Sequence, residues 1–131
     1  MKKGCVILAD SHQNLLEGVR GLLETMFDTV VMVADKKSLF EAAGKLKPEL
    51  AVVDLSLPIS GEVNVAREVK SRYPKLKFII LSVHDEPAAV SEAMSAGASG
   101  FVLKRSIATD IFPAVGEILK GGTYISPSLE V

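Results

Sequence analysis

Polar side chains stand at the ends of four short apolar runs, and their types suit the binding and transfer of a phosphoryl group. Asp10, Asp54, Ser82 and Lys104 each end or directly follow such a run. Carboxylates supply the oxygen ligands that Mg²⁺ prefers, and an ammonium group and a hydroxyl can neutralise and hydrogen-bond phosphoryl oxygens. An aspartate can also be the nucleophile and form an aspartyl phosphate. Together, the four residues indicate a phosphoryl-transfer site.

Each of these residues also has a plainer interpretation. Asp10 suits a loop, and Ser11 after it suits the N-cap of a helix. Ser82 suits a turn, and Lys104 suits a solvated surface charge. Asp54 alone could be a solvated acid after a strand. These residues form a site only if the fold brings their side chains to one place.

The runs that carry these residues alternate with helical patterns. Within residues 50–58, a short continuously apolar run ends in an acid, Asp54, and Pro58 breaks the stretch four residues later; this is typical of a buried strand in a parallel sheet. Apolar stripes with a period near 3.6 residues separate the runs and indicate amphipathic helices. Strands are expected at residues 5–9, 29–34, 50–54, 78–82 and 100–103, and helices at residues 15–26, 38–46, 63–69, 87–94 and 107–119.

Local signals mark several helix ends. Ser38–Glu41 has the form of a capping box and predicts the start of the second helix there. Pro87 suits the first turn of the fourth helix, and Gly97 is expected to end it. The pair Gly121–Gly122 is expected to stop the last helix.

This alternation predicts an α/β fold with a five-stranded parallel sheet, doubly wound as (βα)5, with right-handed crossovers. In the flavodoxin-like strand order 2-1-3-4-5, the switch point lies between strands one and three. Those are the strands that end at Asp10 and Asp54. The fold and the two acids therefore converge on one crevice.

The composition and charge of the chain limit the classes of protein to which it can belong. The chain has 131 residues, 48% hydrophobic and 24% charged, which predicts one ordinary globular domain. Its net charge of -1 argues against a nucleic-acid-binding surface. The single cysteine, Cys5, lies in an apolar run and is expected to be a buried, reduced thiol. No apolar run approaches the ~18 residues that span a membrane, so we expect a cytoplasmic domain with no membrane contact.

The motifs around these residues resemble the receiver domain of bacterial two-component response regulators, over essentially the whole chain. They are Ile7–Asp10, Asp54–Pro58, Ile80–Ser82 and Gly97–Lys104. The resemblance implies a domain of phosphorelay signal transduction, spanning residues 1–122. It does not imply an enzyme, beyond self-catalysed phosphoryl transfer and autodephosphorylation.

The resemblance implies that Asp54 is the phosphate acceptor. It also implies a Mg²⁺ site made by Asp10, Asp54 and the backbone carbonyl of Ser56. The family usually has a second acid directly after the first, where this chain has Ser11. Because a neutral hydroxyl is a poorer Mg²⁺ ligand than a carboxylate, we expect weaker metal binding and slower phosphoryl transfer.

Ser82 and Lys104 match the hydroxyl and the lysine that contact the phosphoryl group in this family. Phe101 matches its rotating aromatic switch, which acts together with Ser82, although Phe101 could equally be a partly buried strand aromatic. His84 either tunes the access of water to the phosphoryl group or is an exposed loop residue. His12 has no supporting ligand cluster and is expected on the surface.

Two further departures from the family pattern concern the backbone. Gly61 comes one residue early, which leaves the start of the third helix open. Arg105 stands where many relatives have proline. A cis peptide before a non-proline residue costs roughly 2.5–4 kcal/mol, so a trans peptide is expected between Lys104 and Arg105.

Within the family, Asp10–His12 and Gly121–Pro127 most resemble the NarL/LuxR-type transcriptional regulators. Those proteins carry a helix-turn-helix DNA-binding domain after the receiver. Residues 123–131 are therefore expected to begin a linker to such a domain, which is absent from this sequence, and DNA would be a partner only through it. The other partners implied are a sensor histidine kinase and a second copy of the chain after phosphorylation.

Particular residues also bear on three alternative functions. A pseudo-receiver that acts only as an interaction module is favoured by Ser11 and opposed by Asp54, Ser82 and Lys104. A phosphatase with an aspartyl nucleophile needs a second acid two residues later, where this chain has Ser56. A flavin carrier of the same fold needs a phosphate loop rich in serine and threonine, which residues 11–14 do not provide.

Overall fold

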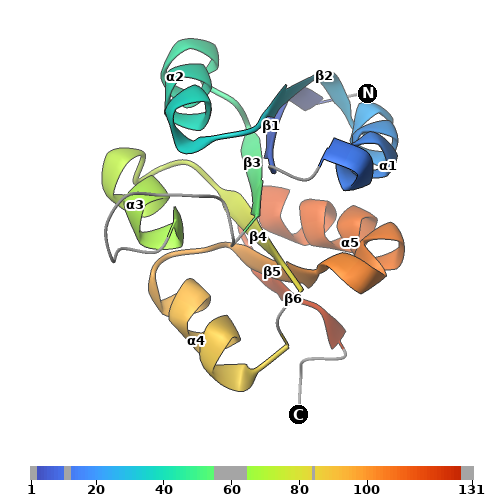
Figure 1. Ribbon diagram of the computed structural model, residues 1–131, viewed down its shortest axis with the longest axis vertical. Coiled ribbons are helices and arrows are strands. Elements are labelled where there is room, and N and C mark those ends of the chain that lie inside the picture. The colour runs from blue at the N-terminus through green and yellow to red at the C-terminus, as the bar shows by residue number, and fades with distance from the viewer. Residues whose placement is uncertain (1–2, 11–12, 55–64, 84, 128–131) are drawn as a thin grey trace.

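The computed structural model describes residues 3–10, 13–54, 65–83 and 85–127, in which strand and helix alternate (Figure 1). The predictions for Ser11, His12, Ser56, Gly61 and His84 lie outside these residues. The strands are β1 Lys3–Ala9, β2 Phe27–Val33, β3 Leu50–Asp54, β4 Phe78–Ser82, β5 Gly100–Leu103 and β6 Tyr124–Ile125. The helices are α1 Gln13–Glu24, α2 Lys36–Leu46, α3 Val65–Arg72, α4 Pro87–Ser95 and α5 Ile107–Leu119, and the 3-10 turn η1 Lys104–Ser106 precedes α5.

The strands form one parallel sheet in the order β2-β1-β3-β4-β5-β6. The predicted doubly wound α/β fold and the order of its first five strands are confirmed. The number of strands differs, because the described residues contain six where five were expected. The sixth strand lies within residues 123–131, which the sequence assigned to a linker.

The sixth strand forms because the chain can approach β5 closely at Gly100. Tyr124 pairs with Gly100, and Ile125 pairs with Phe101. A Cβ atom on Gly100 would lie 3.2 Å from the Tyr124 carbonyl oxygen and 2.8 Å from the Cδ1 atom of Ile118. A larger residue at position 100 would therefore push against both β6 and α5.

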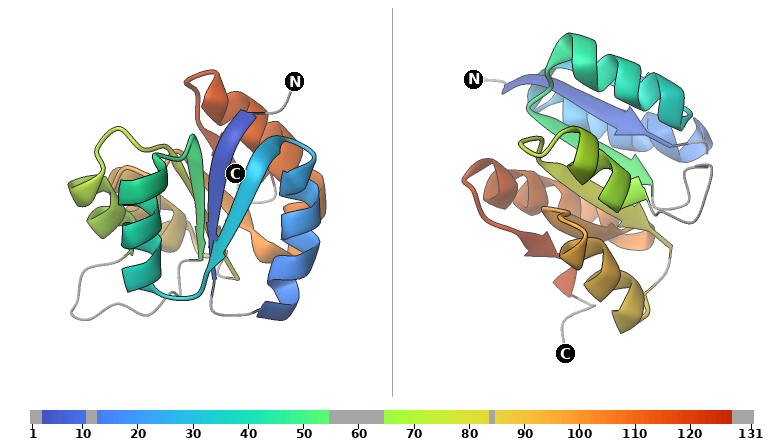
Figure 2. Two further views of the ribbon diagram at one scale, coloured as in Figure 1. Left: turned by 90° about the horizontal axis from the view of Figure 1, so that it is seen from above. Right: turned by 90° about the vertical axis from the view of Figure 1, so that its left-hand side faces the viewer.

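Successive side chains point to opposite faces of the sheet, so each strand contributes to two cores. Val6 and Leu8 of β1 pack in the core under α1 and α5, whereas Ile7 and Ala9 pack in the core under α2, α3 and α4. Figure 2 shows the two sets of helices on opposite sides of the sheet. Burial on both faces explains why the strands read as continuous apolar runs rather than alternating ones.

The predicted ends of the helices are confirmed at three positions and wrong at one. The last helix, α5, ends at Leu119, just before the Gly121–Gly122 pair that was expected to stop it. Pro87 is the first residue of α4, and Gly97 follows that helix with a φ of 108°. The capping box prediction is wrong: α2 begins at Lys36, two residues before the expected start at Ser38, because the Asp35 carboxylate caps the helix. Asp35 Oδ1 accepts a hydrogen bond from the Ser38 backbone N–H at 2.8 Å.

Cys5 is a free thiol, but it is only partly buried, so the expectation of a buried thiol is wrong in degree. This partial desolvation raises the pKa of the thiol above its ordinary value.

In the part of the chain that the structure describes, no helix has the length and apolar character needed to cross a membrane.

Candidate functional site at the carboxyl edge of the sheet

The register of the strands brings Asp10 and Asp54 together. Ala9 of β1 pairs with Val53 of β3, so the residues that follow each of them are neighbours at the carboxyl edge of the sheet. On the next two strands, Ser82 pairs with Leu103, which directly precedes Lys104. The topology therefore gathers the four polar residues singled out in the sequence, as expected for a doubly wound fold.

Lys104 joins the two acids directly. Its Nζ atom donates a hydrogen bond to Asp54 Oδ2 at 2.9 Å, and it lies 3.1 Å from Asp10 Oδ2, within ion-pair distance. The lysine side chain is only 10% exposed, and both aspartates are buried. The Lys104 ammonium group offsets the cost of burying these carboxylates, because an unpaired charge is strongly disfavoured in the protein interior.

The donor set of this site fits Mg²⁺. Two carboxylates share one ammonium group, so the three ionised side chains together carry a net charge of -1, which attracts a cation. Mg²⁺ is usually held by one or two carboxylates, with waters and substrate phosphates completing its coordination. Asp10 and Asp54 satisfy that requirement. Among the described residues, no cluster of three or more histidine, cysteine, aspartate or glutamate side chains offers an alternative all-protein site.

Ser82 and Phe101 are both buried near this edge. Ser82 is the last residue of β4 and is 1% exposed. Phe101, in the middle of β5, is fully buried in the core under α2, α3 and α4, whereas the sequence suggested only partial burial. The difference arises because α2, α3 and α4 cover that face of the sheet, and Phe101 lies in one buried cluster with residues of all three helices.

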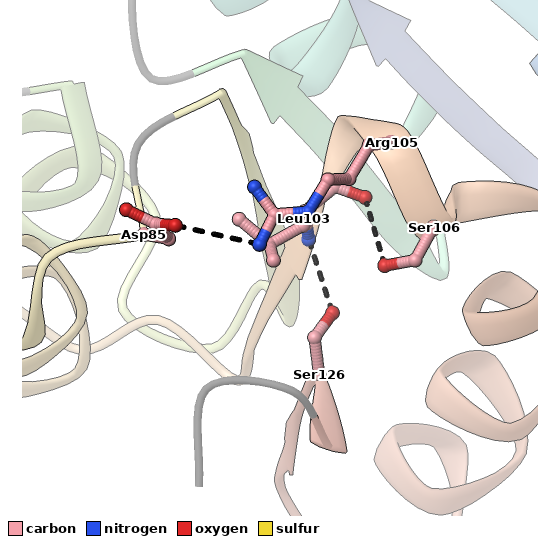
Figure 3. Close-up of polar contacts among 5 residues, drawn as sticks. All are labelled: Asp85, Leu103, Arg105, Ser106 and Ser126. Atoms are coloured by element: carbon pink, nitrogen blue, oxygen red, sulfur yellow. Dashed lines mark hydrogen bonds and ion pairs between the residues drawn. The ribbon is translucent and has the colours of Figure 1, made fainter.

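An exposed ion pair lies next to the buried one. Arg105 Nη2 is 3.4 Å from Asp85 Oδ2, and both side chains are more than half exposed (Figure 3). This pair links the segment between β4 and α4 to the turn after β5. Such exposed pairs contribute little to stability. The peptide between Lys104 and Arg105 is trans, which confirms the expectation for a non-proline residue at this position.

One buried acid, Asp110 in the first turns of α5, was not among the residues predicted from the sequence. It is 6% exposed and accepts hydrogen bonds from Ser106, Tyr124 and Ser126. A signal for it was present: the apolar stripe of this helix runs through Ile107, Ile111 and Ala114, and position 110 lies on the same face. The partners of Asp110 were not foreseeable, because two of them come from the segment after the helix.

The match to known families agrees with the fold. Residues 6–115 match the response regulator receiver domain family, and the chain belongs to that family. The resemblance inferred from the four motifs is thereby confirmed.

Curated relatives assign the chain to the NarL/LuxR type of regulator. It is 32% identical over 126 residues to the transcriptional regulatory protein DegU of Brevibacillus brevis, covering 95% of this chain and 53% of that protein. It is 37% identical over 131 residues to the transcriptional regulatory protein UhpA of Salmonella typhimurium, covering 96% of this chain and 64% of that protein. The chain thus spans between half and two thirds of the length of these relatives.

Solved structures support the same assignment. The isolated receiver domain of RcsB from Salmonella enterica serovar Typhimurium, in the presence of the phosphomimetic BeF3⁻, superimposes with a TM-score of 0.87 at 28% identity. The match covers 98% of this chain and 96% of that domain. The RcsB–DNA complex gives the same TM-score and identity, with coverage of 98% of this chain and 66% of that one. The chain is therefore a receiver domain of the NarL/LuxR type, which fits phosphorelay-controlled regulation of transcription.

Proposed function

We propose that Asp54 accepts a phosphoryl group from a sensor histidine kinase in the cytoplasm and that the domain thereby switches a transcriptional output. The observation that carries this proposal is the contact of the Lys104 ammonium group with Asp54 and Asp10 at the carboxyl edge of the sheet. In this proposal, Asp54 would be the nucleophile, Lys104 would be the cation for the incoming phosphoryl oxygens, and Asp10 would be the second acid for a metal.

The transfer is a displacement at phosphorus. A carboxylate oxygen of Asp54 forms the new O–P bond as the bond from phosphorus to the donor breaks, and the donor keeps the electron pair. The donor is a phosphohistidine nitrogen of the kinase, or the acetate oxygen of acetyl phosphate. Lys104, 2.9 Å from Asp54 Oδ2, is placed to neutralise charge on the transferred group.

The residues that would hold Mg²⁺ are Asp10, Asp54 and the backbone carbonyl of Ser56. When bound, the metal would neutralise charge on the phosphoryl oxygens, as is general in phosphoryl transfer. Asp10 is fully buried, so its carboxylate is fixed in position before any ligand arrives. The neutral Ser11 supplies no charge to this site, and we therefore propose that the metal binds more weakly than it does beside a pair of acids.

Ser82 and Phe101 are proposed to report the phosphorylation of Asp54. Ser82 ends the strand next to β3, where its hydroxyl can hydrogen-bond a phosphoryl oxygen. Phe101 is on the following strand, β5, and its buried position would be one of the two states of the switch. Phosphorylation would then shift the population between these states.

The proposed partners follow the relatives. Two RcsB dimers have been solved on DNA, and we propose that phosphorylation favours a homodimer of this receiver as well. DNA would be contacted through a separate DNA-binding domain rather than through the receiver surface, since the net charge of the chain is -1. Turnover of external substrates is not part of the proposal.

Intact-mass measurement after incubation with acetyl phosphate tests this function. The wild-type chain is expected to gain one phosphoryl group only when Mg²⁺ is present, and Asp54→Ala is expected to gain none. Asp85→Ala is the matched control, because it removes an acid that is exposed and lies outside the buried cluster. Absence of the adduct from the wild-type chain at high Mg²⁺ would refute the proposal and favour a phosphorylation-independent interaction module.

A further inference from the structure

Asp110 is a buried carboxylate that the proposed phosphoryl transfer does not use. Its Oδ2 atom accepts hydrogen bonds from the hydroxyls of Ser126 at 2.6 Å and Ser106 at 2.8 Å. Its Oδ1 atom accepts one from the Tyr124 hydroxyl at 3.2 Å. Hydrogen bonds to an ionised carboxylate are stronger than those between neutral groups. Asp110 therefore ties β6 and the residue after it to the start of α5.

Ser126 also holds the end of β5. Its hydroxyl oxygen accepts a hydrogen bond from the Leu103 backbone N–H at 3.0 Å (Figure 3), and its own N–H donates to the Phe101 carbonyl oxygen at 3.0 Å. Strand pairing between β5 and β6 ends at Phe101 and Ile125. Beyond that point the Ser126 side chain therefore takes the place of a backbone partner for β5.

The direction of these hydrogen bonds is fixed. A hydroxyl has one proton, and Asp110 can only accept when it is ionised. The Ser126 proton therefore points to Asp110, which leaves its oxygen free to accept from Leu103. Ser106 lies 2.8 Å from Asp110 but 3.4 Å from the Leu103 carbonyl oxygen, so its proton also belongs to the carboxylate. The result is a relay from the Leu103 amide through Ser126 to Asp110.

We propose that Asp110 and Ser126 are positioning residues for phosphoryl transfer, which act by fixing Leu103 and hence the adjacent Lys104. This inference rests on the proposed function of Asp54. Lys104 must present one nitrogen atom to two buried acids, and a displacement of about 1 Å at a reacting group can cost about 100-fold in rate. The relay holds the backbone from which the lysine extends.

The same relay couples the site to the residues after the domain core. Coupling of binding equilibria is reciprocal. If Ser126 stabilises the Lys104 geometry that suits a phosphoryl group, then occupation of the Asp54 site stabilises the docking of residues 124–126. The receiver would thus signal through β6, at the start of the segment that the sequence assigned to a linker.

Phosphorylation kinetics of the 131-residue chain with acetyl phosphate test the proposal. Ser126→Ala is expected to lower the rate constant at saturating Mg²⁺ by roughly three- to tenfold, the equivalent of about one hydrogen bond. The Mg²⁺ concentration at half-maximal rate is expected to stay unchanged, because Asp10 and Asp54 do not move. Ser126→Thr keeps the hydroxyl and is expected to restore the wild-type rate.

Tyr124→Phe is the matched control. It removes a hydroxyl from the same carboxylate but leaves the bond between Leu103 and Ser126 in place, so the wild-type rate is expected. Equal rates in Ser126→Ala and wild type would overturn the inference. So would an equal slowing by Tyr124→Phe, which would indicate general loosening of β6. Failure of the wild-type chain to form the adduct would instead overturn the proposed function, and the inference with it.

A second measurement uses the wild-type chain alone and does not depend on the folding of any variant. With BeF3⁻ and Mg²⁺ as the phosphoryl mimic, hydrogen exchange at the amides of Leu103 and Ser126 is expected to slow at least severalfold. The amide of Gly44, in α2 on the opposite face of the sheet from α5, is expected to be unaffected. Unchanged exchange at Leu103 and Ser126, with the mimic bound, would overturn the proposed coupling.

Discussion

Replacing Lys104 by methionine keeps much of the side-chain volume but removes the cation that Asp10 and Asp54 share. At an effective dielectric constant of about 20, an ion pair at this separation attracts by about 5 kcal/mol before the loss of hydration is counted. Removing one partner of a buried ion pair costs about 3–5 kcal/mol in practice. Because the lysine is still 10% exposed, water can partly solvate the carboxylates left behind, and we expect a cost of about 3 kcal/mol.

The assay is urea unfolding at pH 7, followed by circular dichroism, with thermal unfolding alongside. For a domain of this size, a loss of about 3 kcal/mol lowers the midpoint temperature by about 10 °C. Arg105→Met is the control, since it removes the neighbouring cation from an exposed pair that contributes less than about 1 kcal/mol. Adding Asp54→Asn to Lys104→Met is expected to recover part of the loss. Equal costs for the two methionine variants would refute the reasoning.

Three further outcomes are expected. Ser11→Asp should tighten Mg²⁺ binding and speed phosphorylation; equal Mg²⁺ affinities in a titration would contradict this. Asp35→Ala should lower the free energy of unfolding at pH 7. The capping hydrogen bond holds the folded-state pKa of Asp35 below its ordinary value of 3.8. The stabilisation by Asp35 is therefore present above pH 3.8 and disappears as the pH falls through the folded-state pKa. A pH series of urea unfolding checks this. Gly97→Ala should lower the free energy of unfolding by about 1–2 kcal/mol, because Gly97 has a φ of 108°. Gly116→Ala should raise the free energy of unfolding by at most about 1 kcal/mol, because nothing lies within 4 Å of the new Cβ atom. Stabilisation by both glycine substitutions would contradict the backbone argument.

The strands were predictable from the sequence because helices bury them on both faces of the sheet. A parallel strand covered on both faces is a continuous apolar run, and β4 and β5 have the bounds expected from the sequence, 78–82 and 100–103. The site followed from the fold, since parallel strands all present their carboxyl ends at one edge. The sequence alone was therefore enough to assign Asp10, Asp54, Ser82 and Lys104 to that edge.

What could not be predicted depends on contacts between distant residues. Strand β6 has two residues, too few for a periodic pattern, and it pairs because Gly100 leaves room beside β5. The burial of Asp110 is tolerated because Ser126, far along the chain, donates to it. The start of α2 was misplaced because Asp35 and Ser38 are both good N-cap residues, and the pattern alone did not decide between them.

The short sixth strand also bears on the solubility of the molecule. Without it, β5 would be the edge of the sheet, and its residues Gly100–Leu103 are fully buried and apolar. An open apolar edge is a template for strand pairing between molecules and for aggregation. A strand of two residues covers part of that edge and is itself too short to recruit another chain. At the opposite edge, β2 carries the exposed, charged Asp28, which discourages the same pairing. Both edges of the sheet are thus protected against strand pairing between molecules, the β6 edge because that strand is short and the β2 edge because it carries a charge.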